Sequence, residues 1–429
     1  MSFTKKTIKD LNIKGKTILL RADFNVPLDK NGKISSYYRL EQALPTIEYL
    51  LSQDCKVVIC SHLGRPDGRR DLSLSLAPVA KQLGKYIKNQ VYFIGDCVGK
   101  AVTTAVTNLK PKEVLVLENL RYYKEEEEND KEFAKQLASL ADIFVEDGFG
   151  VVHRAHASTQ GVTKYLPSVS GLLLAKEIKA LTSVITDPKK PLMAIVGGAK
   201  IADKIDILKK FIKIADIVVI GGAMANTFLR AKGINIARSL SEPADVPLAH
   251  DILELAEAES KKRQFTFYVP QDSVVAKKID KTAHTRIVDW DSRVFATLES
   301  YPKLPPKSAS KLEADDIILD IGPYSGAFIA GSMQLVKTVI WNGTMGVTEI
   351  PSINGPIGPF AHGTEIVIEA LMGDFGNRPY SLIGGGDTSA YIEDRGLVKC
   401  FNHVSTGGGA SLDLLSGKKL PGIEALMDK

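Results

Sequence analysis

Short apolar runs rich in β-branched residues alternate with helix-like segments along the whole chain. In the first half these runs end in arginine, histidine and aspartate, and in the second half they end in glycine. The runs cover residues 16–26, 56–64, 91–96, 113–121, 142–150, 191–200, 216–224, 265–272, 316–323, 338–346 and 381–388. All are short and continuous enough to be buried on both faces, which predicts βαβ units and parallel sheets.

The length of the chain indicates two domains. A chain of 429 residues exceeds the range in which one hydrophobic core keeps growing. Residues 171–188 carry one apolar stripe at helical spacing, and Pro188 ends it. We therefore expect an α/β protein with domains at 1–170 and 189–406, joined by a helix at which hinge motion is natural.

Composition excludes several classes of protein. The net charge of +5 is mild, and no long basic run with interleaved aromatic residues suggests a nucleic-acid partner. The four cysteines form no CxxC pair, which fits reduced thiols in a cytoplasmic compartment. The N-terminal residues lack an apolar core of signal-peptide length, and no run approaches 18 apolar residues. We expect neither export nor a membrane span.

The strand ends of the first half offer groups for a small anionic molecule. Arg21, Asp23 and Asn25 alternate along one strand end, so their side chains are expected to share a face. A carboxylate beside an amide suits hydroxyl groups, and an arginine suits an anion. An internal pairing of Arg21 with Asp23 is an equally good interpretation of the same pattern.

Further basic residues follow the other strands of the first half. Ser35 and Ser36 can cap a helix whose first turn contains Arg39, where a cation is unfavourable against the helix dipole unless function requires it. The other basic residues at strand ends are His62, Arg65, Arg121, His153, Arg154 and His156. So many basic positions on one domain predict an anion site.

A metal site is the alternative for one part of this set. His153 and His156, with Glu146 and Asp147 nearby, are all residues that can bind a metal ion. The HExxH motif is absent, which disfavours this interpretation without removing it.

Glycine-rich loops in the second half predict nucleotide binding. They cover residues 197–204, 221–228, 384–390 and 405–411, each after a strand and before a predicted helix. Free backbone amides and the helix dipole at such places attract phosphate oxygens. No P-loop motif and no protein-kinase motif is present.

Four polar side chains in these loops are candidates for nucleotide contacts. Lys200 and Lys204 are four residues apart, which predicts one helical face, although two solvated lysines are the simpler interpretation. Asp387 is a hard oxygen ligand for a nucleotide-bound Mg²⁺, and Thr388 can cap the helix and donate to phosphate. Asp387 could equally serve only as a cap.

Taken together, these passages resemble the phosphoglycerate kinase family. The matching segments are RADFNVPL, PTIEYLL, SHLGRP, LENLR, DGFG with HRAHAS, GGAKIADK, GGAMANTFL, DIGP, WNGTMGV, GGGDT and STGGGASL followed by GKKLPG, in the family's order over residues 21–422. The resemblance implies two Rossmann-like, doubly wound parallel-sheet domains joined by the helix hinge, with residues 407–429 packed back on the first domain. It also implies a monomer that transfers a phosphoryl group reversibly between 1,3-bisphosphoglycerate and Mg-ADP, giving 3-phosphoglycerate and ATP in glycolysis.

The resemblance also assigns residues to roles. The acid substrate is expected to contact a set in the first domain: Asp23, Phe24, Asn25, Arg39, His62, Leu63, Gly64, Arg65, Arg121 and Arg154. The nucleotide is expected to contact a set in the second: Lys204, Asn342, Glu349, Gly385, Gly386, Asp387 and Thr388. Arg39 and Lys200, Mg²⁺ bound by Asp387, and the amides of Gly386 and Gly409 are expected to neutralise the migrating phosphoryl group.

Several positions depart from the family pattern. Glu146 replaces a common asparagine, Tyr324 a common lysine and Asn226 the usual phenylalanine. Residues 316–318 replace the usual Trp-Met-Gly stretch, and the loop from Glu349 to Gly363 is longer than typical. Most of these changes lie around the expected base and ribose, so the choice between ATP and GTP stays open.

Two other functions stay open on the sequence alone. An NAD-dependent oxidoreductase would share the glycine turns, although no GxGxxG with a following acidic residue is present. A two-lobed anion-binding protein would share the hinge. The loops at 301–316 and 351–364 carry no evident chemistry.

Overall fold

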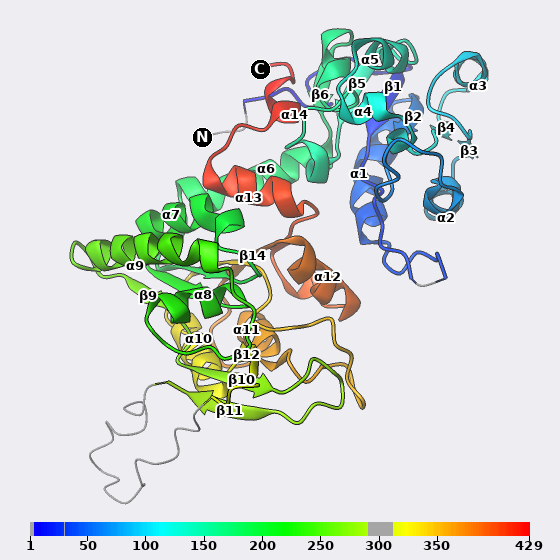
Figure 1. Ribbon diagram of the computed structural model, residues 1–429. Helices are drawn as coiled ribbons and strands as arrows, with labels where there is room; N and C mark the ends of the chain where they lie inside the picture. Colours follow the sequence, from blue (N-terminus) through cyan, green and yellow to red (C-terminus); the bar gives the residue numbers. More distant parts are fainter. Residues whose placement is uncertain (1–3, 30, 291–311) are drawn as a thin grey trace, which may run out of the picture. The chain divides into compact units, whose positions relative to one another are not determined.

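The computed structural model describes residues 4–29, 31–290 and 312–429, so residues 301–311 of one predicted loop lie outside the described residues (Figure 1). The chain divides into two compact units. The first unit consists of residues 1–183 and 406–429, and the second unit of residues 184–405. None of the described helices is long and apolar enough to cross a membrane.

The described residues of the first unit form eight α-helices and six strands: β1 Thr17–Arg21, α1 Tyr38–Ser52, β2 Lys56–Cys60, α2 Ala77–Tyr86, β3 Val91–Phe93, α3 Lys100–Asn108, β4 Val114–Val116, α4 Lys124–Glu127, α5 Lys131–Ala138, β5 Ile143–Glu146, β6 Ser168–Ser170, α6 Leu172–Thr186, α13 Gly408–Ser416 and α14 Pro421–Glu424. The boundary between the units falls inside α6.

The sheet of the first unit is parallel throughout, in the order β3-β4-β2-β1-β5-β6. Most of its strands are buried on both faces, as their continuous apolar sequences predict, whereas the edge strand β3 is exposed at Tyr92. Within β1, Ile18 and Leu20 belong to one hydrophobic cluster and Leu19 to another. The sheet therefore lies between two apolar layers, and its loops carry the polar chemistry.

The elements of the second unit are β7 Leu192–Val196, α7 Ile205–Ile214, β8 Ile217–Ile220, α8 Met224–Ala231, α9 Val246–Ser260, β9 Thr266–Tyr268, β10 Asp272–Ala276, β11 Arg286–Asp289, β12 Ile317–Ile321, α10 Pro323–Met333, β13 Thr338–Asn342, α11 His362–Met372, β14 Tyr380–Gly384, α12 Gly386–Asp394 and β15 His403–Val404. Helix α7 packs against α9, and α10 packs against α11 (Figure 1).

The described residues of the second unit form two sheets. The larger one is parallel, in the order β15-β14-β13-β7-β8-β9. The smaller one has the order β11-β10-β12, and both of its pairs are antiparallel. The two large parallel sheets confirm the predicted α/β class.

All eleven apolar runs contain a strand, but one was placed in the wrong kind of sheet. The run 316–323 contains β12, which pairs antiparallel with β10 instead of joining the parallel sheet. The runs did not include β6, β10, β11 or β15.

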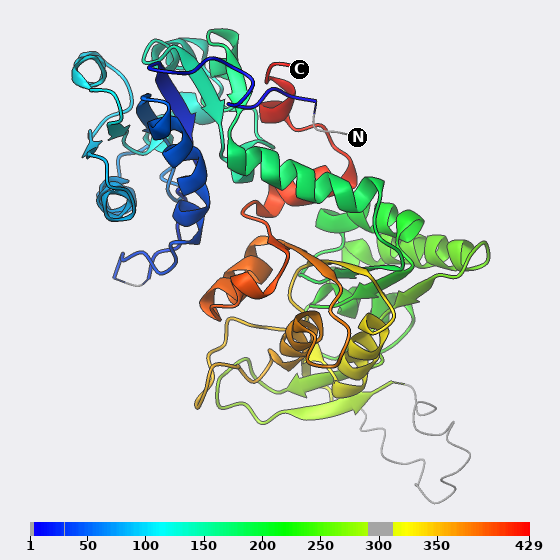
Figure 2. The same ribbon diagram turned by 180° about the vertical axis from the view of Figure 1, so that it is seen from behind.

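The C-terminal segment belongs to the first unit. The Gly422 N–H donates to the Val152 carbonyl at 2.9 Å, and the Met427 N–H donates to the Ser168 carbonyl at 3.0 Å. Lys5 forms an antiparallel bridge with Asp428, and both views show the N-terminal segment beside the C-terminal one (Figures 1 and 2). The two ends of the chain thus meet within one unit.

Candidate active site

Each large parallel sheet has one point where the order of its strands reverses. In the first unit the chain leaves β1 on one side toward β2, and β5 returns to the other side of β1. In the second unit the same reversal separates β7 from β13. Loops at the carboxyl ends of strands beside such a point form the usual ligand site of open α/β sheets.

The loop after β1 forms the centre of the first candidate site. The Asp23 carboxylate pairs with the Arg39 guanidinium and accepts the Asn25 N–H at 3.2 Å. The Asn25 side-chain oxygen accepts the Gly64 N–H at 2.8 Å. These contacts bring residues from two loops and the first turn of α1 together at the carboxyl end of the sheet.

Gly150 packs against the Asp23–Arg39 pair, and sequence reasoning missed this residue. A Cβ atom at Gly150 would overlap the Asp23 carboxylate and crowd the Arg39 guanidinium. Only glycine therefore lets the loop after β5 approach the Asp23–Arg39 pair. The DGFG segment contained the signal, because a glycine following a buried strand marks a close approach.

Two more predicted arginines are held by a residue that the sequence did not single out. Arg121 Nε lies 3.2 Å from the Glu127 carboxylate, and Arg154 Nη1 lies 4.0 Å from it. Arg121 also donates to the Gly64 carbonyl at 2.8 Å. Glu127 belongs to the acidic run 125–128, whose position after a strand-end arginine was the available signal.

Arg21 has a role different from the one that the alternating pattern suggested. It is buried and donates to the Ser158 hydroxyl at 2.8 Å and the Ala22 carbonyl at 2.5 Å, with Nη2 3.3 Å from His62 Nδ1. Asp23 pairs with Arg39 instead, so the internal Arg21–Asp23 pairing is wrong. Arg21 supports His62 from behind the site.

The site is electrically positive, and its buried histidine is neutral. Burial lowers the pKa of His62 well below its usual value, and Arg21, Arg121, Arg39 and Arg154 lower that pKa further. Four guanidinium groups therefore act on one point at which an anion would be stabilised.

The remaining predicted residues of this set lie in the same loops. The Phe24 N–H donates to the Ser61 hydroxyl at 2.9 Å, and Leu63 is held through its N–H by the Asn119 side chain at 3.2 Å. Arg65 is exposed. The Ser36 hydroxyl accepts the N–H of Tyr38, the first residue of α1, so Arg39 does lie in the first turn.

The alternative metal site does not form. Among the described residues, His153, His156, Glu146 and Asp147 do not bring three ligand atoms close enough to hold one ion. Burial and neighbouring arginines lower the pKa of His156 to about 3, and burial followed by Arg154 lowers the pKa of His153. Both rings are neutral at pH 7 and belong to the positive surroundings of the first site.

In the second unit, glycines bring two loops into close contact. A Cβ atom at Gly197, after β7, would overlap the carbonyl oxygens of Thr344 and Gly343, after β13. Gly343 has φ +97°, a conformation that side chains rarely adopt. The strand reversal is therefore lined by closely packed backbone.

Lys204 ties these loops together. Its ammonium group donates to the carbonyls of Gly197 at 2.6 Å and Asn342 at 3.3 Å, and to the Asn342 side-chain oxygen at 2.8 Å. Burial lowers the pKa of Lys204 to about 8, and Asp387 and Asp203 act against that shift. The Asn342 Nδ2 group is buried and has no acceptor among the described residues.

Lys200 does not share a helical face with Lys204, contrary to the prediction. Helix α7 begins at Ile205, so both lysines precede it. Lys200 is half exposed and lies 3.3 Å from Glu242. The loop that follows Gly197 and Gly198 is longer than predicted, so the helix begins only after Lys204.

The first residues of α12 present backbone amides. Gly385 has φ +94° and precedes Gly386, the first helical residue, whose surroundings are open. Asp387 is exposed, and no described residue donates a hydrogen bond to it. Thr388 does not cap the helix, because its hydroxyl is buried and accepts the Gly343 N–H at 2.8 Å.

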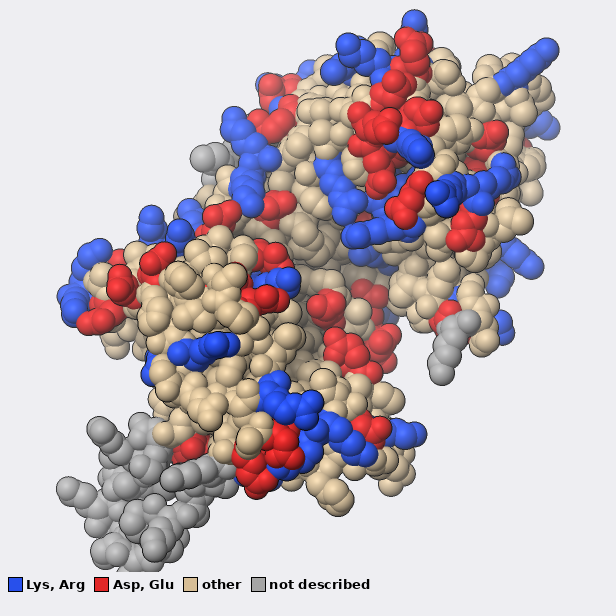
Figure 3. Space-filling view, in the orientation of Figure 1, with Lys and Arg blue, Asp and Glu red and all other residues tan. Residues whose placement is uncertain are grey.

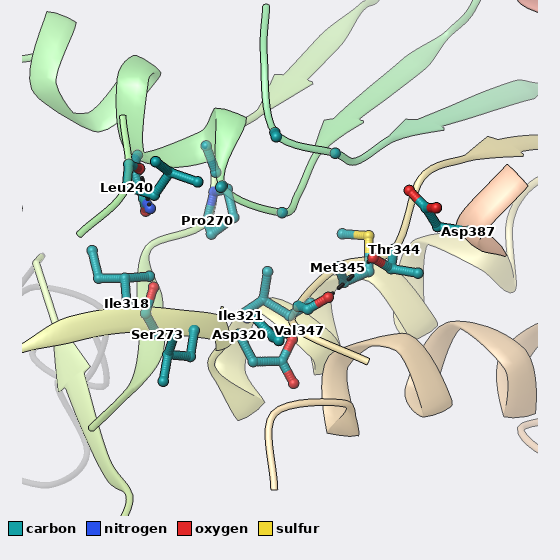
Figure 4. A pocket seen from close by; sticks show the side chains of 18 of the residues that line it. Leu240, Pro270, Ser273, Ile318, Asp320, Ile321, Thr344, Met345, Val347 and Asp387 are labelled. Carbon is teal, nitrogen blue, oxygen red and sulfur yellow. Dashed lines mark hydrogen bonds between the residues drawn. The ribbon is translucent and has the colours of Figure 1, made fainter. Parts of the chain in front are cut away.

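A hollow of about 870 Å³, which includes space open to solvent, lies beside these loops. Leu240, Pro270 and Ile318 lie at one end of it, and Thr344 and Asp387 lie at the other (Figure 4). Glu349 also lines the hollow and is exposed. The hollow is thus apolar at one end and bordered by loop amides and a carboxylate at the other.

The fourth glycine loop, at residues 405–411, belongs mostly to the first unit. Gly407 and Gly409 belong to the first unit, at the start of α13, where a Cβ atom on Gly409 would contact the His153 ring. This loop lies in the second half of the sequence with the other three, but it does not share a unit with them.

One acidic cluster of the second unit forms ion pairs within that unit. Glu313, Asp315 and Asp316 lie together, but Lys277 and Arg286 pair with them, and charges of both signs cover this face near β10 and β11 (Figure 3). Two cations thus offset most of the charge of the three carboxylates, which serve as partners within the unit.

Comparisons with known proteins cover nearly the whole chain. Residues 8–418 match the family model described as phosphoglycerate kinase. Relatives named phosphoglycerate kinase from Dictyoglomus turgidum and Moorella thermoacetica are 45% and 44% identical over 99% of this chain and 100% of their own length.

Solved structures give the same result for the fold. A phosphoglycerate kinase structure from Coxiella burnetii matches with a TM-score of 0.78 at 35% identity, and one from Pyrococcus horikoshii with 0.79 at 29%. Each comparison covers 98% of both chains.

Proposed function

The chain belongs to the phosphoglycerate kinase family, and from this premise we propose that the two strand reversals divide the substrates of its phosphoryl transfer between the units. The enzyme is a glycolytic phosphotransferase that interconverts 1,3-bisphosphoglycerate and ADP with 3-phosphoglycerate and ATP. Family membership decides against the oxidoreductase and anion-binding alternatives. One observation carries the proposal: one reversal is surrounded by guanidinium groups and the other by backbone amides.

The first unit is proposed to bind the acid substrate. Asp23 and Asn25 offer oxygen atoms to its hydroxyl group, and the positive potential around His62 suits its phosphate and carboxylate. Arg65, Arg121 and Arg154 are the proposed phosphate ligands. Phe24, Leu63 and Gly64 position the loops that carry these groups.

The second unit is proposed to bind the nucleotide. The unpaired Asn342 Nδ2 donor and the amides of Gly385 and Gly386 suit phosphate oxygens. Lys204 and Thr388 hold the loops in place, and Glu349 borders the hollow.

Asp387 fits the Mg²⁺ that accompanies a nucleotide. It is exposed at the start of α12, and its carboxylate is free of donors from the described residues. Mg²⁺ prefers one or two carboxylates together with substrate phosphates. When bound, the ion neutralises phosphate charge.

The proposed chemistry requires positioning more than proton transfer. The acceptor is a carboxylate, which needs no general base, and the histidines of the first unit are held neutral. Arg39 and Lys200, with the amides of Gly386 and Gly409, are proposed to stabilise the migrating phosphoryl group. Transfer requires the reacting atoms to come within bonding reach, so we propose that the units close when both substrates are bound.

The direct test is a coupled assay for ATP formation from 1,3-bisphosphoglycerate and Mg-ADP. Turnover is expected for the wild type, and its absence with folded protein would contradict the proposal.

In Asp387→Ala we expect weaker binding of Mg-nucleotide in calorimetry. Unchanged affinity would contradict the metal assignment. Asp374→Ala, also in the second unit, is the matched control.

We also propose that the enzyme acts as a cytoplasmic monomer without a nucleic-acid partner. Its four cysteines are free, and burial raises the pKa of Cys60 to about 12, which keeps that thiol unreactive. Light scattering of the purified protein at micromolar concentration tests the monomer, and a dimer mass would overturn it.

A further inference from the structure

The apolar end of the hollow in the second unit contains a buried polar atom without a partner. Asn226, in the first turn of α8, lines the hollow and is 1% exposed. Its Nδ2 group donates to the Leu240 carbonyl at 2.9 Å. No described residue donates a hydrogen bond to its Oδ1 atom.

The orientation of this amide follows from its partner. A carbonyl oxygen only accepts hydrogen bonds, so the NH₂ group of Asn226 must face Leu240. The unpaired atom is therefore the side-chain oxygen. A buried acceptor without a donor costs free energy, and such atoms in native proteins call for an explanation.

The surrounding residues indicate what approaches this acceptor. Leu240 lines the same end of the hollow and is 59% exposed, so its side chain is accessible to a ligand there. Pro270 and Ile318 complete an apolar wall, and Asp387 lies at the opposite end (Figure 4). The described lining includes no lysine or arginine, so this end suits a planar apolar group and not a phosphate.

We propose that Asn226 is a specificity-determining residue for the nucleotide, with its Oδ1 atom accepting a hydrogen bond from the amino group of a bound adenine. This inference rests on the proposed nucleotide site of the second unit. An acceptor at this point favours a base that carries an N–H donor, because a base without one leaves Oδ1 buried and unpaired.

The test compares ADP with purine riboside 5′-diphosphate, which is the same nucleotide without the amino group. For the wild type we expect kcat/KM to be at least about tenfold higher with ADP. In Asn226→Leu, which keeps the side-chain size and removes the acceptor, the two nucleotides should become nearly equivalent.

Thr227→Val is the matched control. Thr227 is also 1% exposed and belongs to the same helix turn, but it does not line the hollow. This variant should keep the wild-type preference. Calorimetric affinity of each variant for 3-phosphoglycerate shows whether the first unit is intact, and nucleotide-binding affinities are measured beside the rates.

Three outcomes would overturn the proposal: equal use of both nucleotides by the wild type, an unchanged preference in Asn226→Leu, or a wild-type preference for GDP over ADP that Asn226→Leu abolishes. The last would assign the acceptor to the amino group of guanine. Absence of any phosphoryl transfer would contradict the proposed function instead, and the binding affinities would still test Asn226.

Discussion

Arg39 shows why residue types alone did not determine the site. The sequence placed it in the first turn of a helix, where the dipole disfavours a cation, and left the partner of Asp23 open. The structure resolves the question because α1 carries Arg39 back to the loop after β1, where it pairs with Asp23. Such a pairing depends on how the helix returns over the sheet, which local spacing does not reveal.

Replacing Arg39 tests its proposed role in transfer. In Arg39→Ala we expect kcat to fall by about 10²-fold or more, because a donor to the migrating phosphoryl group is lost. Thermal unfolding is measured to confirm the fold. Arg69→Ala, an exposed arginine of the same unit, should keep normal turnover. Near-normal kcat in Arg39→Ala would remove it from this role.

Glu146 is a residue whose burial has a cost that depends on pH. Its side chain is fully buried, Oε1 accepts the Gly148 N–H at 2.8 Å, and Oε2 has no partner among the described residues. Burial raises the pKa of Glu146 well above its usual value, although Arg21 opposes the shift. The folded protein therefore holds a proton that the unfolded chain releases above its ordinary carboxyl pKa of about 4.5.

This sign gives a pH-dependent prediction. Below about pH 4.5 Glu146 is protonated in both the folded and the unfolded protein, so it does not lower the free energy of unfolding. As the pH rises above this value, the unfolded chain releases the proton that the folded protein keeps, and the free energy of unfolding falls. Glu146→Gln should therefore be more stable than the wild type at pH 8, by about 1 kcal/mol or more, and nearly equal to it at pH 4.5. Denaturant unfolding at both pH values measures the difference. The exposed Glu48→Gln should show none, and a constant difference for Glu146→Gln would contradict the assignment.

At the scale of elements, the apolar runs predicted where strands lie but not how each strand pairs. The run at 316–323 has the same composition as its parallel neighbours, yet β12 joins β10 in an antiparallel sheet. The partner strands β10 and β11 contain Asp272, Ser273 and Arg286, so their sequences did not form apolar runs. Strand partners depend on contacts between distant segments, so the sequence of a single run does not specify its partner.

Loop elements at the strand reversal of the second unit depend on close backbone packing. In Gly197→Ala we expect a loss of about 1–3 kcal/mol in unfolding free energy, because the added methyl group would overlap the Thr344 and Gly343 carbonyls. The KM for ADP should also rise, since these loops border the hollow.

Gly331→Ala provides the matched control, because Gly331 lies in α10 with open space around it. Here we expect a gain of about 0.5–1 kcal/mol from the helical alanine and an unchanged KM. Denaturant unfolding and ADP titrations compare the two variants. Equal behaviour of both would show that the approach of the two loops does not matter.

At the scale of the whole molecule, the proposed transfer requires the two units to close. We expect 3-phosphoglycerate and Mg-ADP together to reduce the radius of gyration more than either ligand alone, because only the pair brings the reacting groups together. Small-angle X-ray scattering with each ligand and with both measures this change. An unchanged radius with both bound would argue against closure.

Since the second unit interrupts the first, the order of synthesis matters. The first unit needs residues 406–429, where Met427 and Lys429 bond to the segments around Ser168 and Thr4. These residues are synthesised after the second unit, which is complete at Ser405. The nascent chain should therefore finish the second unit before the first, which stays incomplete until residues 406–429 have emerged from the ribosome.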